Sequence, residues 1–286
     1  MRPGRLLQHG NTSHLHEWGT GAVAKVLRAD IPAHWAEREA LTTELVRAIG
    51  LPAPTVLGLV DVDGRPGIVF ERVDGPSMLE EAVRRPEQAL GLGQQLAALQ
   101  RLVAARTAPA ALPRLRDRLA ANLARAELAG PVRTAVQARL ASLPSGTAVC
   151  HFDLHPGNVL LGPGGPVLID WFDAAAGDPH ADVVRTATLL HAGFGDGHLA
   201  SAPAPVLAAL LTGYLGALEP DVAADPGWEP VVRAARVAEP VGAAAHEALR
   251  AAVHAALRRE PGATQGRATE RGTPGVRPAS PSARAR

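Results

Sequence analysis

Carboxylates and histidines are concentrated in the stretch CHFDLHPGNVLLGPGGPVLIDWFDAAAGDPHAD, residues 150–182. It contains five aspartates and three histidines, and neither lysine nor arginine. Clustered carboxylates repel one another unless a cation lies among them. This segment is therefore the first candidate for a site that binds a metal ion or a cationic substrate.

Asp153, Asn158 and Asp170 have a spacing that suits magnesium. Asp153 and Asn158 fall on one short turn, and Asp170 ends the apolar run 167–169. That run can pair with 159–161 through the turn GPGG, and such a hairpin brings Asn158 and Asp170 together at one end. One amide oxygen and one carboxylate suit Mg²⁺, which takes few protein ligands and completes its shell with water and phosphate oxygens. Asp153 would lie beside a metal-bound phosphate without being a ligand.

The elements that must position these residues begin with a sheet. Between residues 6 and 73, alternating or β-branched runs are separated by turns that contain glycine. They predict a small, mostly antiparallel sheet. Apolar residues at helical spacing between 32 and 49, followed by Gly50 and Pro52, predict one helix packed on that sheet.

The composition changes after residue 75, where helix formers dominate. A mainly helical second lobe is expected over 76–260, interrupted at 148–172 by a strand-loop-strand passage. From 261 to 286 the chain has almost no apolar content, which predicts a disordered tail. The predicted helices span 91–106, 113–130, 132–143, 179–192, 206–218 and 228–259.

The catalytic-loop segment resembles a known family. HFDLHPGNVLL, followed by VLIDW and GDP, is similar to the aminoglycoside phosphotransferase family of kinase-like small-molecule phosphotransferases. The resemblance implies an α+β, two-lobed protein-kinase-like fold, with a nucleotide-binding lobe at 1–75 and a hinge at 70–75. It also implies that Asp153 accepts or orients the substrate hydroxyl and that Asn158 and Asp170 hold Mg²⁺.

Three further residues of the motif follow from the same resemblance. His151 would brace the loop, and His155 takes the place where protein kinases carry a lysine. Phe152 departs from the pattern, because glycine is the commoner occupant in this family. Asp178 is expected either to lie near the substrate or to cap the helix ahead of Pro179.

Lys25 is the only lysine in a chain with 29 lysines plus arginines. In the family resemblance it matches the lysine that contacts the nucleotide phosphates. Glu39 in the helix that follows matches its ion-pair partner, with Glu37 and Glu44 as alternatives. A lysine places a compact charge on a flexible stem, whereas arginine is a wide planar fork.

The remaining nucleotide contacts are also implied by the resemblance. GNTS, residues 10–13, would cover the phosphates, with Gly10 and Ser13 facing phosphate oxygens. FERVDG, residues 70–75, matches the hinge, where backbone groups near Glu71 and Val73 would bind the adenine edge. ATP or GTP is the expected co-substrate, with Mg²⁺ as the cofactor.

The resemblance implies a small-molecule acceptor, with the late helices as a wall of its pocket. From residue 150 to 249 the chain has twelve acids against three arginines. An acidic wall favours a cationic, hydroxylated acceptor such as an aminoglycoside or a basic peptide antibiotic, although these acids can equally pair with the arginine-rich helices. A metabolic kinase acting on choline or a sugar is the nearest alternative. The candidate acceptor contacts are Asp173, Trp228, Glu239 and Glu247.

Two other classes of function compete with a kinase. HFDLH could supply imidazole ligands to a metal hydrolase, and the same fold could serve as an inactive nucleotide-binding scaffold. The first leaves Asn158 and Lys25 without a role, and a scaffold does not need Lys25, Asp153, Asn158 and Asp170 together. Asp182 is expected to hydrogen-bond the backbone of the loop.

The composition limits which binding partners and which cellular compartment are expected. The net charge of +1 gives no overall field that favours nucleic acid or an anionic membrane, and neither partner is expected. One cysteine, Cys150, cannot form an intrachain disulfide and is expected to be a buried thiol. With no apolar run long enough for a signal peptide or a membrane span, we expect a cytoplasmic protein.

Overall fold

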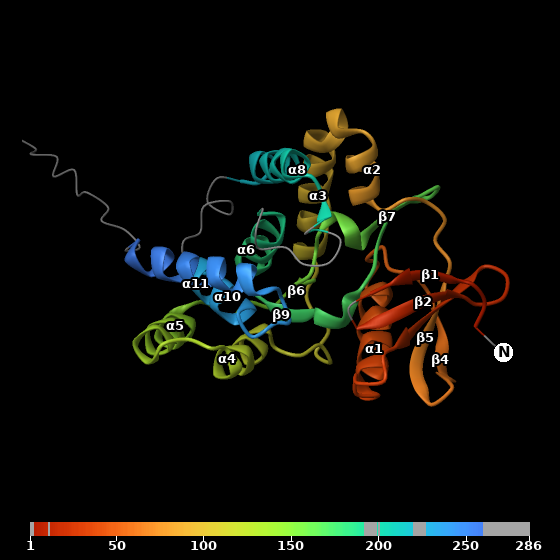
Figure 1. The fold of residues 1–286 in the computed structure, drawn as a ribbon, viewed down its shortest axis with the longest axis horizontal. Coiled ribbons are helices and arrows are strands. Elements are labelled where there is room, and N and C mark those ends of the chain that lie inside the picture. Colours follow the sequence, from red (N-terminus) through yellow and green to blue (C-terminus); the bar gives the residue numbers. More distant parts are fainter. Residues whose placement is uncertain (1–2, 11, 192–198, 200, 220–226, 260–286) are drawn as a thin grey trace, which may run out of the picture.

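The computed structural model describes residues 3–10, 12–191, 199, 201–219 and 227–259, and its elements form a two-lobed, kinase-like fold (Figure 1). A small lobe consists of an antiparallel sheet with one helix against it, and a larger, mainly helical lobe follows. The predicted α+β architecture is confirmed. The predicted tail, 261–286, lies outside the described residues.

The small lobe contains a five-stranded sheet in the order β1-β2-β3-β5-β4, and all neighbouring strands are antiparallel. Residues between β3 and β4 form its helix, α1. The elements are β1 (Leu6–His9), β2 (Ser13–Glu17), β3 (Ala22–Leu27), α1 (His34–Ala48), β4 (Val56–Val62) and β5 (Arg65–Glu71).

Alternation along β3 determines which way Lys25 points. Successive side chains of a strand face opposite sides of the sheet. Ala24 and Val26 are fully buried in the cluster on one face. Leu27 packs on the other face, against Ala36 of α1. Lys25 shares the face of Leu27, and α1 therefore covers it.

The large lobe holds eight named α-helices and two short antiparallel sheets among the described residues. Its helices are α2 (Met78–Arg84), α3 (Ala89–Ala104), α4 (Leu115–Arg125), α5 (Gly130–Ser142), α6 (Pro179–Leu190), α8 (Ala204–Gly216), α10 (Glu229–Arg236) and α11 (Ala243–Arg258). Its strands are β6 (Ala148–Cys150), β7 (Val159–Gly162), β8 (Gly165–Leu168) and β9 (Ala175–Gly177), with β6 paired to β9 and β7 to β8.

Two glycines allow α3 and α8 to approach each other closely. A Cβ atom on Gly93 would overlap the carbonyl group of Leu210, and one on Gly213 would overlap that of Leu90. Within the described residues, no helix is long and apolar enough to cross a membrane.

The prediction of one helix over 228–259 is wrong. The segment forms α10 and α11, which are separated by an irregular stretch that contains Glu239 and Pro240. Proline has no N–H to donate and disfavours helical backbone at the residue before it. The sequence analysis also missed α2, although Ser77 and Glu80 form a capping box at its start.

Candidate active site

Lys25 and Glu39 form a buried ion pair. Lys25 Nζ lies 2.7 Å from Glu39 Oε1 and 2.8 Å from Oε2. Glu39 lies three residues from the buried Ala36, on the inner face of α1, whereas Glu37 and Glu44 are exposed. Burial raises the pKa of Glu39 and the Lys25 ammonium opposes that rise. Because both carboxylate oxygens contact Nζ, the geometry fits an ionised pair.

Lys25 also contacts the large lobe. Its Nζ lies 3.1 Å from Asp170 Oδ1. Burial alone would lower the pKa of Lys25, but Asp170 and Glu39 raise it above its ordinary value. Burial likewise acts to raise the pKa of Asp170, and Lys25 outweighs this and holds that pKa below its ordinary value. The lysine is therefore charged and the Asp170 carboxylate ionised at neutral pH.

The β7–β8 hairpin brings Asn158 and Asp170 together, as its sequence predicted. Val159 pairs with Leu168, and the next amide, Ile169 N, donates to Asn158 O at 3.0 Å. Asp170 then adopts a left-handed conformation, with φ 62° and ψ 61°. A non-glycine residue in this region is strained, and such strain is concentrated at functional sites.

The donor atoms that remain at this end of the hairpin fit Mg²⁺. Asn158 Nδ2 donates to the backbone oxygen and to Oδ2 of Asp153, both at 3.0 Å, and this leaves the amide oxygen of Asn158 for a cation. The Asp170 side chain is 39% exposed and contacts Lys25 through Oδ1. One amide oxygen and one ionised carboxylate are hard donors of the kind that Mg²⁺ prefers.

Asp153 lies beside Asn158 with its side chain 27% exposed. Burial raises the pKa of Asp153 well above its ordinary value, and Asp170 and Asp173 add to this rise, while Arg185 opposes it. A carboxylate with a raised pKa accepts a proton more readily, which is the property required of a general base.

His151 is buried and neutral. Its Nε2 lies 3.1 Å from Ile169 O, and its Nδ1 accepts from Asp153 N at 3.3 Å. Burial lowers the pKa of His151 to about 4. The tautomer that satisfies both contacts carries its proton on Nε2. The imidazole therefore connects the catalytic loop to the strand end that carries Asp170.

His155 also contributes to the loop, where its Nδ1 accepts from Gly157 N at 3.1 Å. Its Nε2 lies 3.8 Å from Asp153 Oδ2. Across the described parts of the chain, no group of three or more His, Cys, Asp or Glu side chains is placed to hold a metal ion.

Asp182 of α6 holds the loop backbone, as predicted. Its Oδ2 accepts from His151 N and its Oδ1 from Phe152 N, each at 2.8 Å, and Gln100 Nε2 donates to Oδ2 at 2.9 Å. Phe152 has a φ of 61°, in the region that favours glycine. Asp178 caps α6 with its side chain, as its position before Pro179 predicted.

The family model described as "Phosphotransferase enzyme family" matches residues 7–231. The chain belongs to the phosphotransferase enzyme family. It is a phosphotransferase of the kinase-like type, and the catalytic-loop and hairpin residues described above lie within the matched range. No curated protein sequence matches the chain.

Solved structures of phosphotransferases have the same fold. A thermostable mutant of aminoglycoside phosphotransferase APH(4)-Ia superposes with a TM-score of 0.62 at 16% identity, covering 89% of this chain and 93% of that one. Aminoglycoside-3'-phosphotransferase of type VIII gives 0.53 at 20%, covering 82% and 90%. A choline/ethanolamine kinase family protein from Mesorhizobium loti gives 0.52 at 18%, covering 90% and 89%. At these identities the likeness concerns the fold.

In this phosphotransferase the β1–β2 turn carries the candidate phosphate contacts. Gly10 N donates to Ser13 O at 2.8 Å, which closes the turn. A Cβ atom on Gly10 would lie 2.9 Å from Ser13 O, so a larger residue would have to displace the backbone. The glycine is needed for the shape of this turn.

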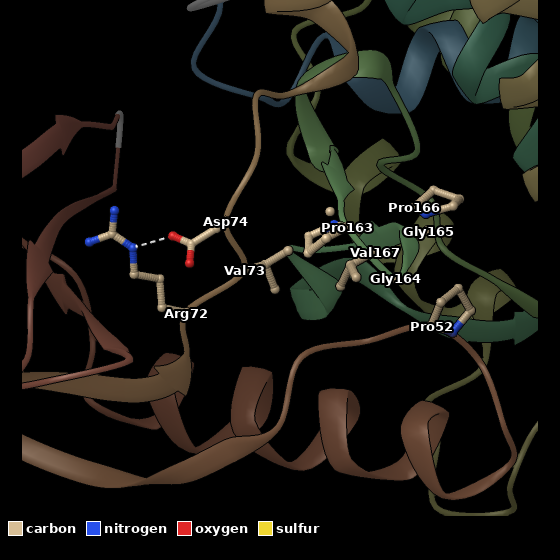
Figure 2. A pocket seen from close by; sticks show the side chains of 10 residues that line it. Pro52, Arg72, Val73, Asp74, Pro163, Gly164, Gly165, Pro166 and Val167 are labelled. Carbon is tan, nitrogen blue, oxygen red and sulfur yellow. Dashed lines mark hydrogen bonds and ion pairs between the residues drawn. The ribbon is translucent and has the colours of Figure 1, made fainter.

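Segment 70–75, the predicted hinge, is held near its N-terminal end by residues 71 and 72. Glu71 Oε2 accepts from Thr55 Oγ1 at 2.6 Å, and Arg72 N donates to Gly21 O at 2.9 Å. Arg72 turns toward Asp74, with Nε 2.8 Å from Oδ1, and away from the β7–β8 turn (Figure 2). Val73 faces that turn.

A cavity of about 330 Å³ lies between the hinge and the β7–β8 turn (Figure 2). Its lining includes neither Lys25 nor any of Asp153, Asn158 and Asp170, so the cavity is separate from the candidate catalytic residues. It is lined by Pro52, Arg72, Val73, Asp74 and residues 162–167.

The four candidate acceptor contacts lie in different environments. Asp173 is paired with Arg118 of α4, and Glu247 is exposed on α11. Trp228 is 1% exposed and belongs to the core cluster beneath α10. The prediction that Trp228 offers a stacking surface is wrong, because its ring fills the hydrophobic core. Glu239 accepts hydrogen bonds from arginines that the sequence analysis did not single out.

Arg185 is the site residue that the sequence analysis missed. It is 3% exposed and lies 3.6 Å from Asp153 Oδ1 through Nη2. The available signal was its position three residues after Asp182 on α6, which places both side chains on one helix face.

Proposed function

We propose that this chain transfers the γ-phosphoryl group of ATP or GTP to a hydroxyl group of a small molecule. The supporting observation is the set of contacts that connects Lys25, Asp170, Asn158 and Asp153. Lys25 supplies a fixed positive charge at 3.1 Å from Asp170, and Asn158 binds Asp153 at 3.0 Å. Phosphoryl transfer needs positioning and charge stabilisation more than covalent chemistry from the protein.

Each residue then has a distinct role. Lys25, held by Glu39, binds phosphate oxygens. Asn158 and Asp170 would hold Mg²⁺, which when bound neutralises charge on the phosphates. Asp153 orients the acceptor hydroxyl and accepts its proton as the new O–P bond forms, while the bond from the γ-phosphorus to the β–γ bridging oxygen breaks and the nucleoside diphosphate leaves. His151 and His155 keep the loop in shape.

The nucleotide is proposed to lie between the lobes, with 1–75 as the nucleotide-binding lobe and 76–260 as the acceptor lobe. Gly10 and Ser13 offer their turn to the phosphates, and backbone groups near Glu71 and Val73 contact the base. A nucleoside triphosphate is a cytoplasmic co-substrate, so the cytoplasm is the proposed location.

A cationic antibiotic is the leading acceptor, and inactivation of that antibiotic the proposed outcome. The supporting feature is the group of carboxylates around Asp153, which includes Asp173 and Glu239. A neighbour with the same fold was solved in a ternary complex with ADP and hygromycin B. Aminoglycosides and basic peptide antibiotics both carry the required hydroxyl and ammonium groups.

A metabolic kinase acting on choline or a sugar is the second candidate, and one specific observation favours a neutral acceptor such as a sugar. Asp173 pairs with Arg118, and Glu239 pairs with Arg185 and Arg236. These arginines compensate much of the negative charge that a cationic acceptor would otherwise meet.

A screen with γ-labelled ATP and GTP separates the candidates. Purified protein is incubated with Mg²⁺ and a panel of aminoglycosides, basic peptide antibiotics, choline and sugars, and phosphate incorporation is measured, with Asp153→Ala as the inactive control. Transfer to an antibiotic supports the leading proposal, and transfer only to choline or a sugar supports the second. If nucleotide binds without turnover, the scaffold alternative replaces both.

A further inference from the structure

Arg185 of α6 contacts both the backbone and the side chain of the catalytic loop. Its Nε donates to Phe152 O at 3.1 Å, and its Nη2 lies 3.6 Å from Asp153 Oδ1. Its guanidinium carbon lies 5.5 Å from the centroid of the Phe152 ring. The side chain is 4% exposed, so these contacts are shielded from water.

The other edge of the guanidinium group is held by Glu239. Arg185 Nη1 and Nη2 donate to Oε1 and Oε2 of Glu239 at 2.8 and 3.0 Å, a bidentate geometry that fixes the plane of the group. Glu239 is itself held, because Arg236 Nη1 donates to Oε2 at 2.6 Å and His246 Nε2 lies 2.9 Å from its backbone oxygen. The stretch between α10 and α11 is thus a fixed support for Arg185.

Phe152 explains why the loop needs this support. With φ at 61°, its backbone is in a left-handed conformation that is strained for a non-glycine residue. Helix α6 holds both of its peptide groups: Asp182 accepts from the N–H, and Arg185 donates to the carbonyl oxygen. Two residues three positions apart on one helix therefore maintain the strained conformation immediately before Asp153.

The charges around Arg185 keep it ionised. Burial alone would lower the pKa of Arg185, but Glu239 and Asp153, with Asp173 further away, raise it above its ordinary value. A buried ion is tolerated only when it is paired and hydrogen-bonded, and the planar fork of arginine can meet several partners at once.

We propose that Arg185, fixed by Glu239, is a positioning residue that orients the Asp153 carboxylate toward the acceptor hydroxyl. Asn158 binds Oδ2 of that carboxylate at 3.0 Å. Arg185 faces Oδ1 at 3.6 Å, beyond normal hydrogen-bond distance. The positive charge therefore attracts Oδ1 and limits rotation of the carboxylate, while Oδ1 can still accept a hydrogen bond from a hydroxyl. Glu239, on this inference, supports the base and does not contact the acceptor.

This inference rests on the proposed function, and a double-mutant cycle tests it. The variants are Arg185→Gln, Asp153→Asn and the combination, assayed as ADP release from Mg·ATP with water as acceptor, so that no acceptor need be known. Arg233→Gln is the control, because Arg233 is an arginine that pairs with Glu229 within its own helix, α10. Circular dichroism melts verify folding of each variant.

If Arg185 acts through Asp153, Arg185→Gln lowers kcat about 10- to 100-fold while KM for ATP changes less than about twofold. The double variant is then no slower than Asp153→Asn alone, within about twofold. Arg233→Gln retains the wild-type rate. The inference is overturned if the double variant shows the product of the two single-variant losses in kcat. It is also overturned if Arg185→Gln raises KM for ATP and leaves kcat unchanged.

Glu239→Gln provides a second route if Arg185→Gln does not fold. It leaves Arg185 in place, removes one charged partner, and should lower kcat about 3- to 10-fold in the wild-type background and not at all in Asp153→Asn. Equal losses in both backgrounds overturn the inference. Failure of the wild-type protein to release ADP both with water and with every acceptor of the panel contradicts the proposed function, and is thereby distinguished from failure of the inference.

Discussion

Lys25 Nζ lies 3.1 Å from Asp170 Oδ1, a contact that connects the central strand of the small lobe to the catalytic segment of the large one. The same ammonium group contacts both carboxylate oxygens of Glu39. One lysine thus meets two carboxylates from different lobes, in a chain that otherwise uses arginine for its positive charges.

Lys25→Arg should lower kcat/KM for ATP about 100-fold, although the charge is preserved. The guanidinium group of arginine is wider than an ammonium group. It does not fit between Glu39 and Asp170, where the wild type places only Lys25 Nζ. Steady-state kinetics with varied ATP measures the effect. Arg28→Lys, which exchanges the same two residue types at an exposed position after β3, is the matched control and should have the wild-type rate. Equal activity of the two variants would show that a lysine is not required at position 25.

Asp182→Asn should lower the free energy of unfolding by about 2–4 kcal/mol. The carboxylate is fully buried and accepts from His151 N, Phe152 N and Gln100 Nε2, and an amide turns one acceptor oxygen into a donor that faces these N–H groups. Urea unfolding followed by tryptophan fluorescence measures the loss. Glu44→Gln, on the exposed side of α1, should change stability little. A loss of similar size in Glu44→Gln would contradict the explanation that the buried hydrogen bonds of Asp182 cause the effect.

His151 should make stability depend on pH. In the unfolded chain its pKa is 6.5, and burial lowers the pKa to about 4 in the folded protein. Between these values the unfolded state binds a proton that the folded state does not. The His151 contribution is therefore complete above pH 6.5 and falls by up to about 3 kcal/mol as the pH drops toward 4.

His151→Gln isolates this contribution. The difference in free energy of unfolding between wild type and variant, measured by urea titration at several pH values, should shift in favour of the variant as the pH falls. A difference that stays constant from pH 7 to 4.5 would mean that the ring is not held neutral.

Trp228 should behave as a core residue. Trp228→Ala should cost about 3–5 kcal/mol of stability, because it empties a large buried volume. Trp228→Phe should cost much less, because among the described residues Nε1 has no hydrogen-bond partner to lose. Thermal and urea unfolding measure both. If Trp228→Ala instead keeps its stability and raises KM for the acceptor alone, the ring contacts the acceptor.

The site was predictable where it lies within a short stretch of sequence. The hairpin between Asn158 and Asp170 followed from two apolar runs and a glycine turn, and the Asp182 and Asp178 contacts followed from their positions near the loop and at a helix start. The pairing of Lys25 with Glu39 came from a family resemblance, although strand alternation and helix spacing explain it physically.

The contacts of Arg185 and the burial of Trp228 depend on tertiary packing. Residues 153, 185 and 239 are far apart in sequence. The spacing from Asp182 places Arg185 on the helix face that meets the loop, but no local pattern indicates that Glu239 meets it there. Trp228 was misassigned for a similar reason, because a tryptophan beside glycine and glutamate has the same sequence context whether its ring is covered or exposed. Pro240 did carry a signal, and it correctly marks the break between α10 and α11.

The central claim is that Asp153 and Asp170 perform separate parts of a magnesium-dependent phosphoryl transfer. The most direct test measures ADP release and MgATP binding for the wild type, Asp153→Asn and Asp170→Asn, with and without EDTA. We predict that the wild type turns over only with Mg²⁺, that Asp153→Asn binds MgATP normally but turns over at least about 100-fold more slowly, and that Asp170→Asn loses the Mg²⁺-dependent part of binding. Turnover that persists in EDTA, or an Asp153→Asn variant with the wild-type rate, would contradict the account.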